Sequence, residues 1–157
     1  MIYDFNADDM FEIAEQLERN GAKFYREAAQ AVVNDRDRSL LQQLAEMEDD
    51  HEKTFAGMRA ELSAKEKSST VFDPDNEAAM YLRALADTKV FFDKQIDTSS
   101  MEAILKDAIT AEKDSIVFYL GMREAIPGDL GRERLDAIIK EEMGHIRLLS
   151  KELVTLK

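Results

Sequence analysis

Apolar residues recur at helical spacing in long stretches of the chain, and each stretch predicts an amphipathic helix. The first stretch covers residues 7 to about 33. At its start, Asn6 and Asp9 resemble a helix-capping arrangement. A polar break at residues 34–37 separates it from a second apolar stripe over residues 41–62. Because the break is short, we expect two antiparallel helices joined by a tight connection.

The second half of the chain predicts another pair of helices after a long connection. Residues 63–99 begin with a polar segment and continue with a shorter apolar-periodic stretch, so we expect a crossover that carries a short helix of its own. Thr98, Ser99 and Ser100 offer N-caps for a third stripe, which stops at Pro127. A fourth stripe covers residues 135–153. We therefore predict an all-α, antiparallel four-helix bundle made of two helical hairpins, in a single domain over residues 1–157.

Composition narrows the functions that such a bundle could have. The chain has 33 acidic and 21 basic residues and a net charge of −12, which repels nucleic acids and anionic membranes. It has no cysteine, so any metal must be held by nitrogen and oxygen ligands. The first ten residues contain no basic segment, and no apolar run reaches the length of a membrane span. We expect a cytoplasmic protein.

A faint internal repeat relates the two predicted hairpins. Its offset is 94 residues. The first and third helices share the phrase Glu-x5-Phe-Tyr, and the second and fourth helices share Glu-x-x-His. The polar members of the repeat are Glu18, Tyr25, Glu48 and His51 in the first half and Glu112, Tyr119, Glu142 and His145 in the second. An approximate two-fold axis would bring these matching side chains together at the centre of the bundle.

The spacing and type of these residues indicate a metal centre. Residues three apart project from the same helix face, so Glu48 and His51 can reach one ion, and the matching pair on the fourth helix can do the same. Four carboxylates placed on apolar stripes would each cost several kcal/mol if they were buried without compensation. Two divalent ions would balance them when both imidazoles are neutral. Oxygen-rich ligand sets with one nitrogen per ion suit iron or manganese.

Simpler interpretations of the same residues stay open at this stage. A glutamate on an amphipathic helix is usually solvated, and a single inward histidine is more often hydrogen-bonded core than ligand. Tyr25 and Tyr119 are either core aromatics that find some partner for the hydroxyl or residues that orient a ligand carboxylate by a hydrogen bond. A metal-free helical interaction module therefore remains an alternative.

The six acidic and imidazole positions resemble the ferritin-like superfamily, whose di-iron sites use two single glutamates and two Glu-x-x-His pairs. Within it, the chain is most similar to the rubrerythrin-like branch, which shares the Glu-x5-Phe-Tyr phrase. The resemblance implies a ferritin-like fold and a pair of metal ions, most often iron, with manganese or mixed pairs as alternatives and zinc as an occupant in crystals. Rubrerythrins proper carry a cysteine-rich rubredoxin domain, whereas this chain has no cysteine. Ser115 stands where that branch often has a further glutamate.

We therefore expect a non-haem di-iron oxidoreductase that reduces hydrogen peroxide or dioxygen with electrons from an external donor protein. Glu48 and Glu142 would bridge the ions, Glu18 and Glu112 would be terminal ligands, and the two histidines would supply one nitrogen each. A ferroxidase or iron-handling protein is the main alternative, since it would use the same ligands. We expect a homodimer for the oxidoreductase and a large hollow particle for iron storage.

Overall fold

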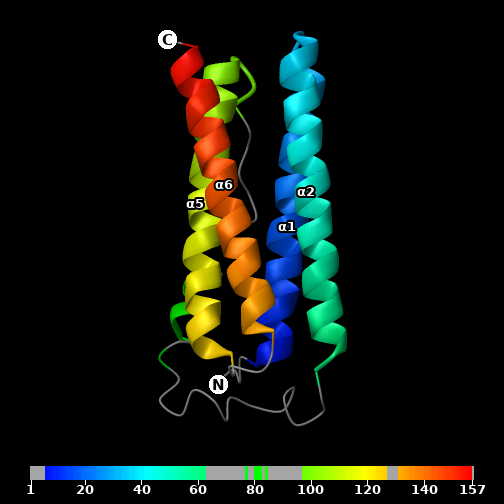
Figure 1. Ribbon diagram of the computed structural model, residues 1–157, viewed down its shortest axis with the longest axis vertical. Coiled ribbons are helices and arrows are strands. Elements are labelled where there is room, and N and C mark those ends of the chain that lie inside the picture. Colours follow the sequence, from blue (N-terminus) through cyan, green and yellow to red (C-terminus); the bar gives the residue numbers. More distant parts are fainter. Residues whose placement is uncertain are drawn as a thin grey trace.

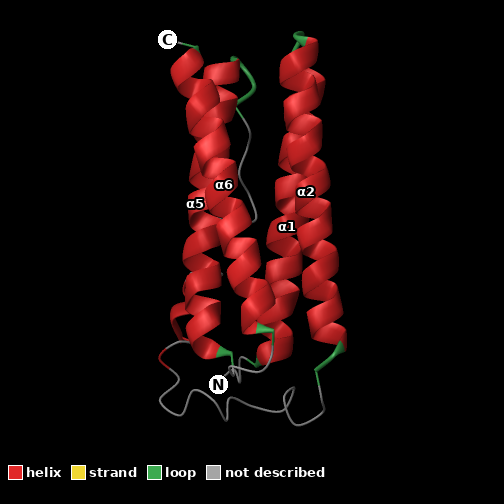
Figure 2. Cartoon of the chain, in the orientation of Figure 1, coloured by secondary structure: helices red, strands yellow, loops and turns green. Residues whose placement is uncertain are grey.

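The computed structural model describes residues 6–62, 97–126 and 131–156, together with Glu77, Met80, Tyr81, Leu82 and Ala84. These residues form the long helices α1 (Ala7–Ala31), α2 (Asp35–Ala60), α5 (Met101–Ala125) and α6 (Arg132–Thr155), and no strand occurs among them (Figures 1 and 2). The predicted all-α class and the four long helices are confirmed.

Local side-chain chemistry fixes where the helices begin. The Asn6 side chain accepts a hydrogen bond from the Asp9 backbone N–H, and the Asp9 side chain accepts one from the Asn6 backbone N–H, each at 3.0 Å. This capping box is the one predicted from the sequence. Asn34 caps α2 and Ser100 caps α5 through their side-chain oxygens. Helix α6 begins instead at Gly131, whose φ of +83° is a left-handed conformation that favours glycine.

The four helices pair into two antiparallel hairpins, α1 with α2 and α5 with α6 (Figure 1). Backbones approach closely within each hairpin and less closely between hairpins, so the two hairpins meet mainly through side chains. The site described below lies between the hairpins, at mid-height in the bundle.

Two apolar clusters occupy the bundle core on either side of that level. One cluster is built from the first half of α1, the second half of α2, the second half of α5 and the first half of α6, and the other comes from the opposite halves. Their large buried members include Phe11, Phe55, Phe118, Tyr119 and Met122 in the first cluster and Phe24, Tyr25, Leu41, Leu44 and Leu105 in the second. The polar residues of the site therefore form a layer between two apolar layers.

The structure differs from the sequence prediction in small ways. Helix α1 ends at Ala31, two residues before the predicted end, because Val32 is extended. In the predicted crossover, Glu77, Met80, Tyr81, Leu82 and Ala84 are helical, in line with the expected short helix, and most of residues 63–96 lie outside the described part. The assignment of residues 1–157 to a single domain stays a prediction. No described helix is both long and apolar enough to cross a membrane.

Candidate metal centre

Each of the four helices contributes to one polar cluster inside the bundle. Glu18 comes from α1, Glu48 and His51 from α2, Glu112 from α5, and Glu142 and His145 from α6. None of the six is more than 4% exposed. The structure thus brings together all six residues that the sequence singled out as metal ligands.

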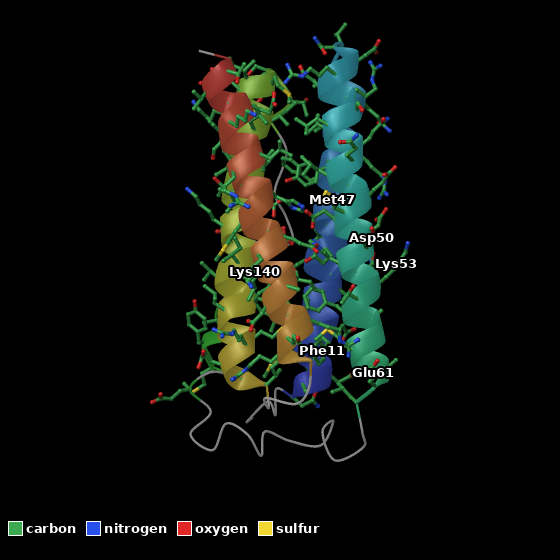
Figure 3. The ribbon with its side chains drawn as sticks, in the orientation of Figure 1. Phe11, Met47, Asp50, Lys53, Glu61 and Lys140 are labelled. Atoms are coloured by element: carbon green, nitrogen blue, oxygen red, sulfur yellow. The ribbon has the colours of Figure 1, made fainter. Side chains whose placement is uncertain are left out.

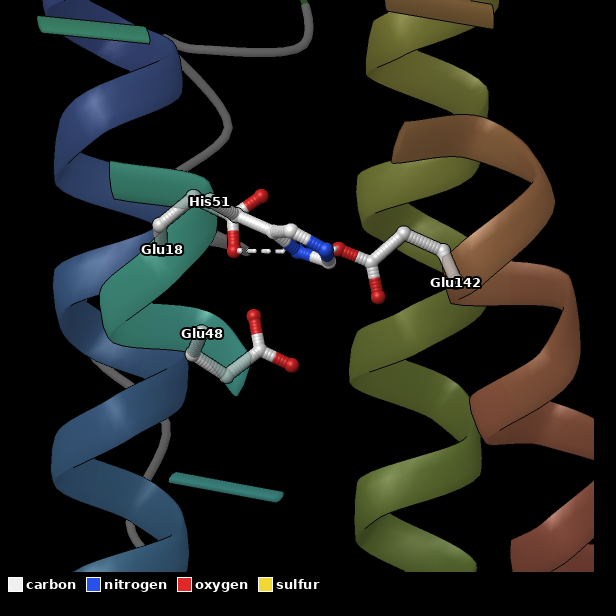
Figure 4. Close-up of side chains that lie close together, drawn as sticks. All are labelled: Glu18, Glu48, His51 and Glu142. Carbon is white, nitrogen blue, oxygen red and sulfur yellow. Dashed lines mark hydrogen bonds and ion pairs between the residues drawn. The ribbon is translucent and has the colours of Figure 1, made fainter. Parts of the chain in front are cut away.

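The six residues form two overlapping groups whose nitrogen and oxygen atoms converge. One group is Glu18, Glu48, His51 and Glu142, and the other is Glu48, Glu112, Glu142 and His145. Within each group, one atom from every residue lies within 4.8 Å of the others. Figure 4 shows the first group, with Glu18, Glu48 and His51 of one hairpin facing Glu142 of the other. Glu48 and Glu142 belong to both groups, as two bridging carboxylates would.

Both imidazoles turn the same ring nitrogen toward the carboxylates. His51 Nδ1 lies 3.0 Å from Glu142 Oε1 and 3.4 Å from Glu18 Oε2. His145 Nδ1 lies 3.0 Å from Glu142 Oε2, 3.3 Å from Glu112 Oε1 and 3.4 Å from Glu48 Oε1. The two rings stack with centroids 5.8 Å apart and planes 19° from parallel. The Nδ1 atoms are therefore the nitrogens available to two neighbouring ions.

Two tyrosine hydroxyls connect the hairpins to each other at the site. Tyr25 on α1 donates a hydrogen bond to Glu112 Oε1 on α5, at 2.5 Å. Tyr119 on α5 donates a reciprocal hydrogen bond to Glu18 Oε1 on α1. Both phenol rings are buried. These hydrogen bonds between the hairpins are the ones expected if each tyrosine orients a ligand carboxylate.

Sequence reasoning missed Glu141, which also contacts the centre. Its Oε2 atom lies 2.5 Å from His51 Nε2, the ring nitrogen that faces away from the carboxylate cluster. The Glu141 side chain is 55% exposed, and its position next to Glu142 made it look like an ordinary surface residue. No spacing rule places it near His51, since the two residues lie on helices of different hairpins.

Protein cations do not neutralise the cluster. Arg19, beside Glu18 in sequence, pairs with Glu52 at 2.9 Å and is half exposed. Lys53, two residues after His51, is 79% exposed, and Figure 3 shows it on the outer side of α2. In the part of the chain that the structure describes, the only cationic groups that reach these carboxylates are the two imidazoles.

The cluster strongly perturbs the pKa values of its members. Burial raises the pKa of Glu18 and of Glu48 well above the usual carboxyl range, and it raises the pKa of Glu112 to about 8. Burial also favours the protonated form of Glu142, but the imidazoles of His145 and His51, each 3.0 Å from one of its oxygens, outweigh burial and hold the pKa of Glu142 low. Without metal, protons must therefore compensate much of the carboxylate charge.

The histidine pKa values shift in the matching direction. Burial alone would lower the pKa of His51, but hydrogen bonds to Glu142 and Glu141 raise it to about 9. The pKa of His145 rises to about 12 against the same effect of burial, because Glu112, Glu142 and Glu48 surround the ring. Protons and metal ions would compete for the same atoms, so metal binding would release protons.

Several buried polar atoms at the centre lack hydrogen-bond partners among the described residues. They are Glu18 Oε2, Glu48 Oε1, Glu142 Oε2 and both ring nitrogens of His145. Buried polar groups are normally satisfied, and these atoms are common ligand types for iron and manganese. Two divalent ions would coordinate the three carboxylate oxygens and His145 Nδ1, and they would balance the four carboxylates. The residues present therefore fit a two-metal centre.

Gly21 leaves room for one of the shared carboxylates. A Cβ at this position would stand 3.2 Å from Glu48 Oε2 and 3.3 Å from Glu48 Cδ, closer than most van der Waals contacts. The repeat matches Gly21 to Ser115, and Ser115 is the position where rubrerythrins often have a further glutamate. The two halves of the centre are therefore related in their ligands but differ in the residues around them.

Comparisons with known proteins agree with this architecture. The family model for rubrerythrin matches residues 1–59, which cover α1 and nearly all of α2. A Thermotoga maritima protein, described provisionally as ferritin-like and diiron-carboxylate, superimposes with a TM-score of 0.73 and 21% identity over 100% of both chains. No curated protein matches the sequence significantly.

The fold of the chain over its whole length is the ferritin-like fold. Its sequence is rubrerythrin-like over the first hairpin, which carries Glu18, Glu48 and His51. The chain thus has the ferritin-like fold, and its first hairpin is similar in sequence to rubrerythrin.

Proposed function

We propose that this protein is a di-metal oxidoreductase that reduces hydrogen peroxide or dioxygen at the carboxylate centre, with iron as the metal. The observation that carries the proposal is the pair of buried ligand groups that share Glu48 and Glu142. Structural metal sites do not require two overlapping groups, whereas chemistry on one O–O bond benefits from two ions about 3.5–4 Å apart.

In this proposal Glu48 and Glu142 would bridge the two ions. Glu18 and His51 would hold one ion, and Glu112 and His145 would hold the other. The hydroxyls of Tyr25 and Tyr119 each donate a hydrogen bond to one oxygen of a terminal carboxylate, which fixes the orientation of that carboxylate at the centre. Residues from both hairpins are therefore needed for each position.

When bound, a pair of iron(II) ions would supply two electrons, one from each ion. Peroxide reduction consumes these electrons and two protons and yields two water molecules. The chain's own residues keep the ions in place, and the apolar layers above and below the centre limit access of bulk water. The chain has no cysteine, so the electrons for the next turnover come from an external donor protein in this proposal. We also propose a cytoplasmic homodimer.

The decisive experiment is elemental analysis of protein purified without oxygen, followed by absorbance spectra on addition of peroxide and, separately, dioxygen. We expect two iron ions per chain and new charge-transfer absorption with at least one oxidant. Two bound ions that remain spectroscopically unchanged by both oxidants would overturn the oxidoreductase proposal.

The same experiment tests the other interpretations. Oxidation of many added Fe(II) ions per chain, with a large particle on size exclusion, would indicate iron handling, in which iron is also the substrate. A melting temperature that does not change after chelation, with no bound metal, would indicate a metal-free interaction module.

A further inference from the structure

The two histidines differ in what their outer ring nitrogen meets. His51 Nε2 faces Glu141 Oε2 at 2.5 Å. His145 Nε2 is buried and has no hydrogen-bond partner within the described parts of the chain. The Nδ1 atoms of both rings face the carboxylates, so this outer contact is the clearest difference between the two imidazoles.

The internal repeat shows why only one histidine has this contact. At the offset of 94 residues, His51 matches His145 and Glu141 matches Met47. Met47 lies on α2 and is labelled in Figure 3. A thioether sulfur is a weak acceptor, whereas a carboxylate oxygen is a strong one. The six ligands therefore follow the two-fold repeat, but the residues that face the outer nitrogens of the two histidines do not.

An acceptor at Nε2 changes what the imidazole can do as a ligand. When Nε2–H donates to Glu141, the tautomer is fixed and the lone pair is on Nδ1, which points at Glu18 and Glu142. The hydrogen bond also fixes the ring orientation and increases the basicity of Nδ1. Among the described residues His145 has no such partner, so no hydrogen bond at its Nε2 fixes the tautomer or the ring orientation.

We propose that Glu141 is a positioning residue for His51 alone and that it makes the two metal positions unequal. The position completed by Glu18 and His51 fills first and holds its ion more tightly than the position completed by Glu112 and His145. This inference rests on the proposed two-metal function, and it adds an order of loading that the ligand set alone does not specify.

The test is a titration of the metal-free full-length protein with Mn(II), monitored by calorimetry and by electron paramagnetic resonance. We expect two binding steps whose dissociation constants differ by about 10–100-fold, the usual effect of an outer partner on a histidine ligand. The spectrum should show an isolated ion at one equivalent and a coupled pair at two. His145→Ala should retain the tight step, and His51→Ala should lose it.

Variants at the two matched positions test the cause. Glu141→Ala should weaken the first step by roughly 10–100-fold and leave the second step nearly unchanged. Glu141→Gln should recover part of the loss, because its amide oxygen still accepts a hydrogen bond. Met47→Glu should strengthen the second step. Glu133→Gln removes a charge from an exposed position of the same helix and is the matched control.

Different outcomes separate this inference from the proposed function. Two ions bound in equal steps, tight binding that survives His51→Ala, or first-step affinity unaffected by Glu141→Ala would overturn the inference and leave a two-metal oxidoreductase intact. Failure to bind two ions would overturn both. Glu141 and Met47 are both partly exposed, and thermal melts of each variant will show that the fold is retained.

Discussion

The Tyr25 hydroxyl on α1 donates a hydrogen bond to Glu112 on α5, and the two oxygen atoms are 2.5 Å apart. Tyr119 on α5 repeats this relation with Glu18 on α1, so each hairpin orients a carboxylate of the other. The phenylalanine before each tyrosine packs edge to face against it, at 86° in the first hairpin and 78° in the second. The Glu-x5-Phe-Tyr phrase thus encodes a glutamate that faces the centre and a supported hydroxyl that reaches across to the other hairpin.

Removing one tyrosine hydroxyl should weaken one metal position selectively. Tyr25→Phe is expected to weaken the ion held by Glu112 and His145 by about tenfold, because that carboxylate loses the bond that directs it. Tyr119→Phe should weaken the ion held by Glu18 and His51. Stepwise metal titration measures both effects. Tyr81→Phe, at a tyrosine that is 45% exposed, is the control and should change neither step. An identical response to the two buried substitutions would contradict the assignment.

Glu142 and Glu18 should differ in how many ions their loss removes. Glu142 belongs to both ligand groups, so Glu142→Ala should abolish loading of two ions. Glu18 belongs to one group, so Glu18→Ala should leave about one ion per chain. Elemental analysis after gel filtration gives these ratios. If Glu142→Ala still bound two ions, the bridging role would be excluded.

Metal-free protein should become less stable as the pH rises from 6 to 9. The folded chain keeps a proton on Glu112 up to a pKa of about 8 and on His51 up to about 9, whereas the unfolded values are near 4.5 and 6.5. In this window the folded state binds more protons than the unfolded state, so the free energy of unfolding falls with pH. The stabilisation from His51 is fully present below pH 6.5 and is lost as the pH passes 9.

Thermal melts at several pH values measure this dependence. A loss on the order of a few kcal/mol would lower the melting temperature by roughly 5–10 °C in a chain of this size. Metal-loaded protein is the control, since its ligands have already exchanged protons for ions and its melting temperature should vary less. Parallel curves for the two forms would show that the buried cluster does not determine the pH response.

Substitution by alanine should affect metal binding at Gly21 but not at Gly57, although both glycines lie inside helices. At Gly57 an added Cβ meets no atom within 4 Å, so Gly57→Ala should raise the free energy of unfolding by about 0.5–1 kcal/mol through helix propensity, with unchanged metal binding. At Gly21 the added Cβ presses on the Glu48 carboxylate, so metal affinity should fall severalfold. Denaturant unfolding and metal titration of both variants give the comparison. Equal metal affinity in the two variants would mean that Glu48 adjusts freely.

Several features of the folded chain follow from local sequence patterns. The Asn6 cap, the helix stripes and the inward positions of Glu18, Glu48, His51, Glu112, Glu142 and His145 follow from local rules, because helical periodicity relates sequence spacing directly to a helix face. The Gly131 start of α6 was not predicted, because its special feature is a backbone conformation and not a side-chain cap.

Residue spacing was thus enough to predict the ligand types, the helix faces that carry them and the repeat that relates the two halves. The folded chain was needed to show which oxygen each tyrosine binds and that both histidines turn Nδ1 inward. It was also needed to show that His51 contacts Glu141, whereas His145 Nε2 finds no acceptor among the described residues. Most of these contacts join helices of different hairpins. Their geometry depends on how far apart and at what rotation the hairpins pack, and spacing along one helix carries no information about either.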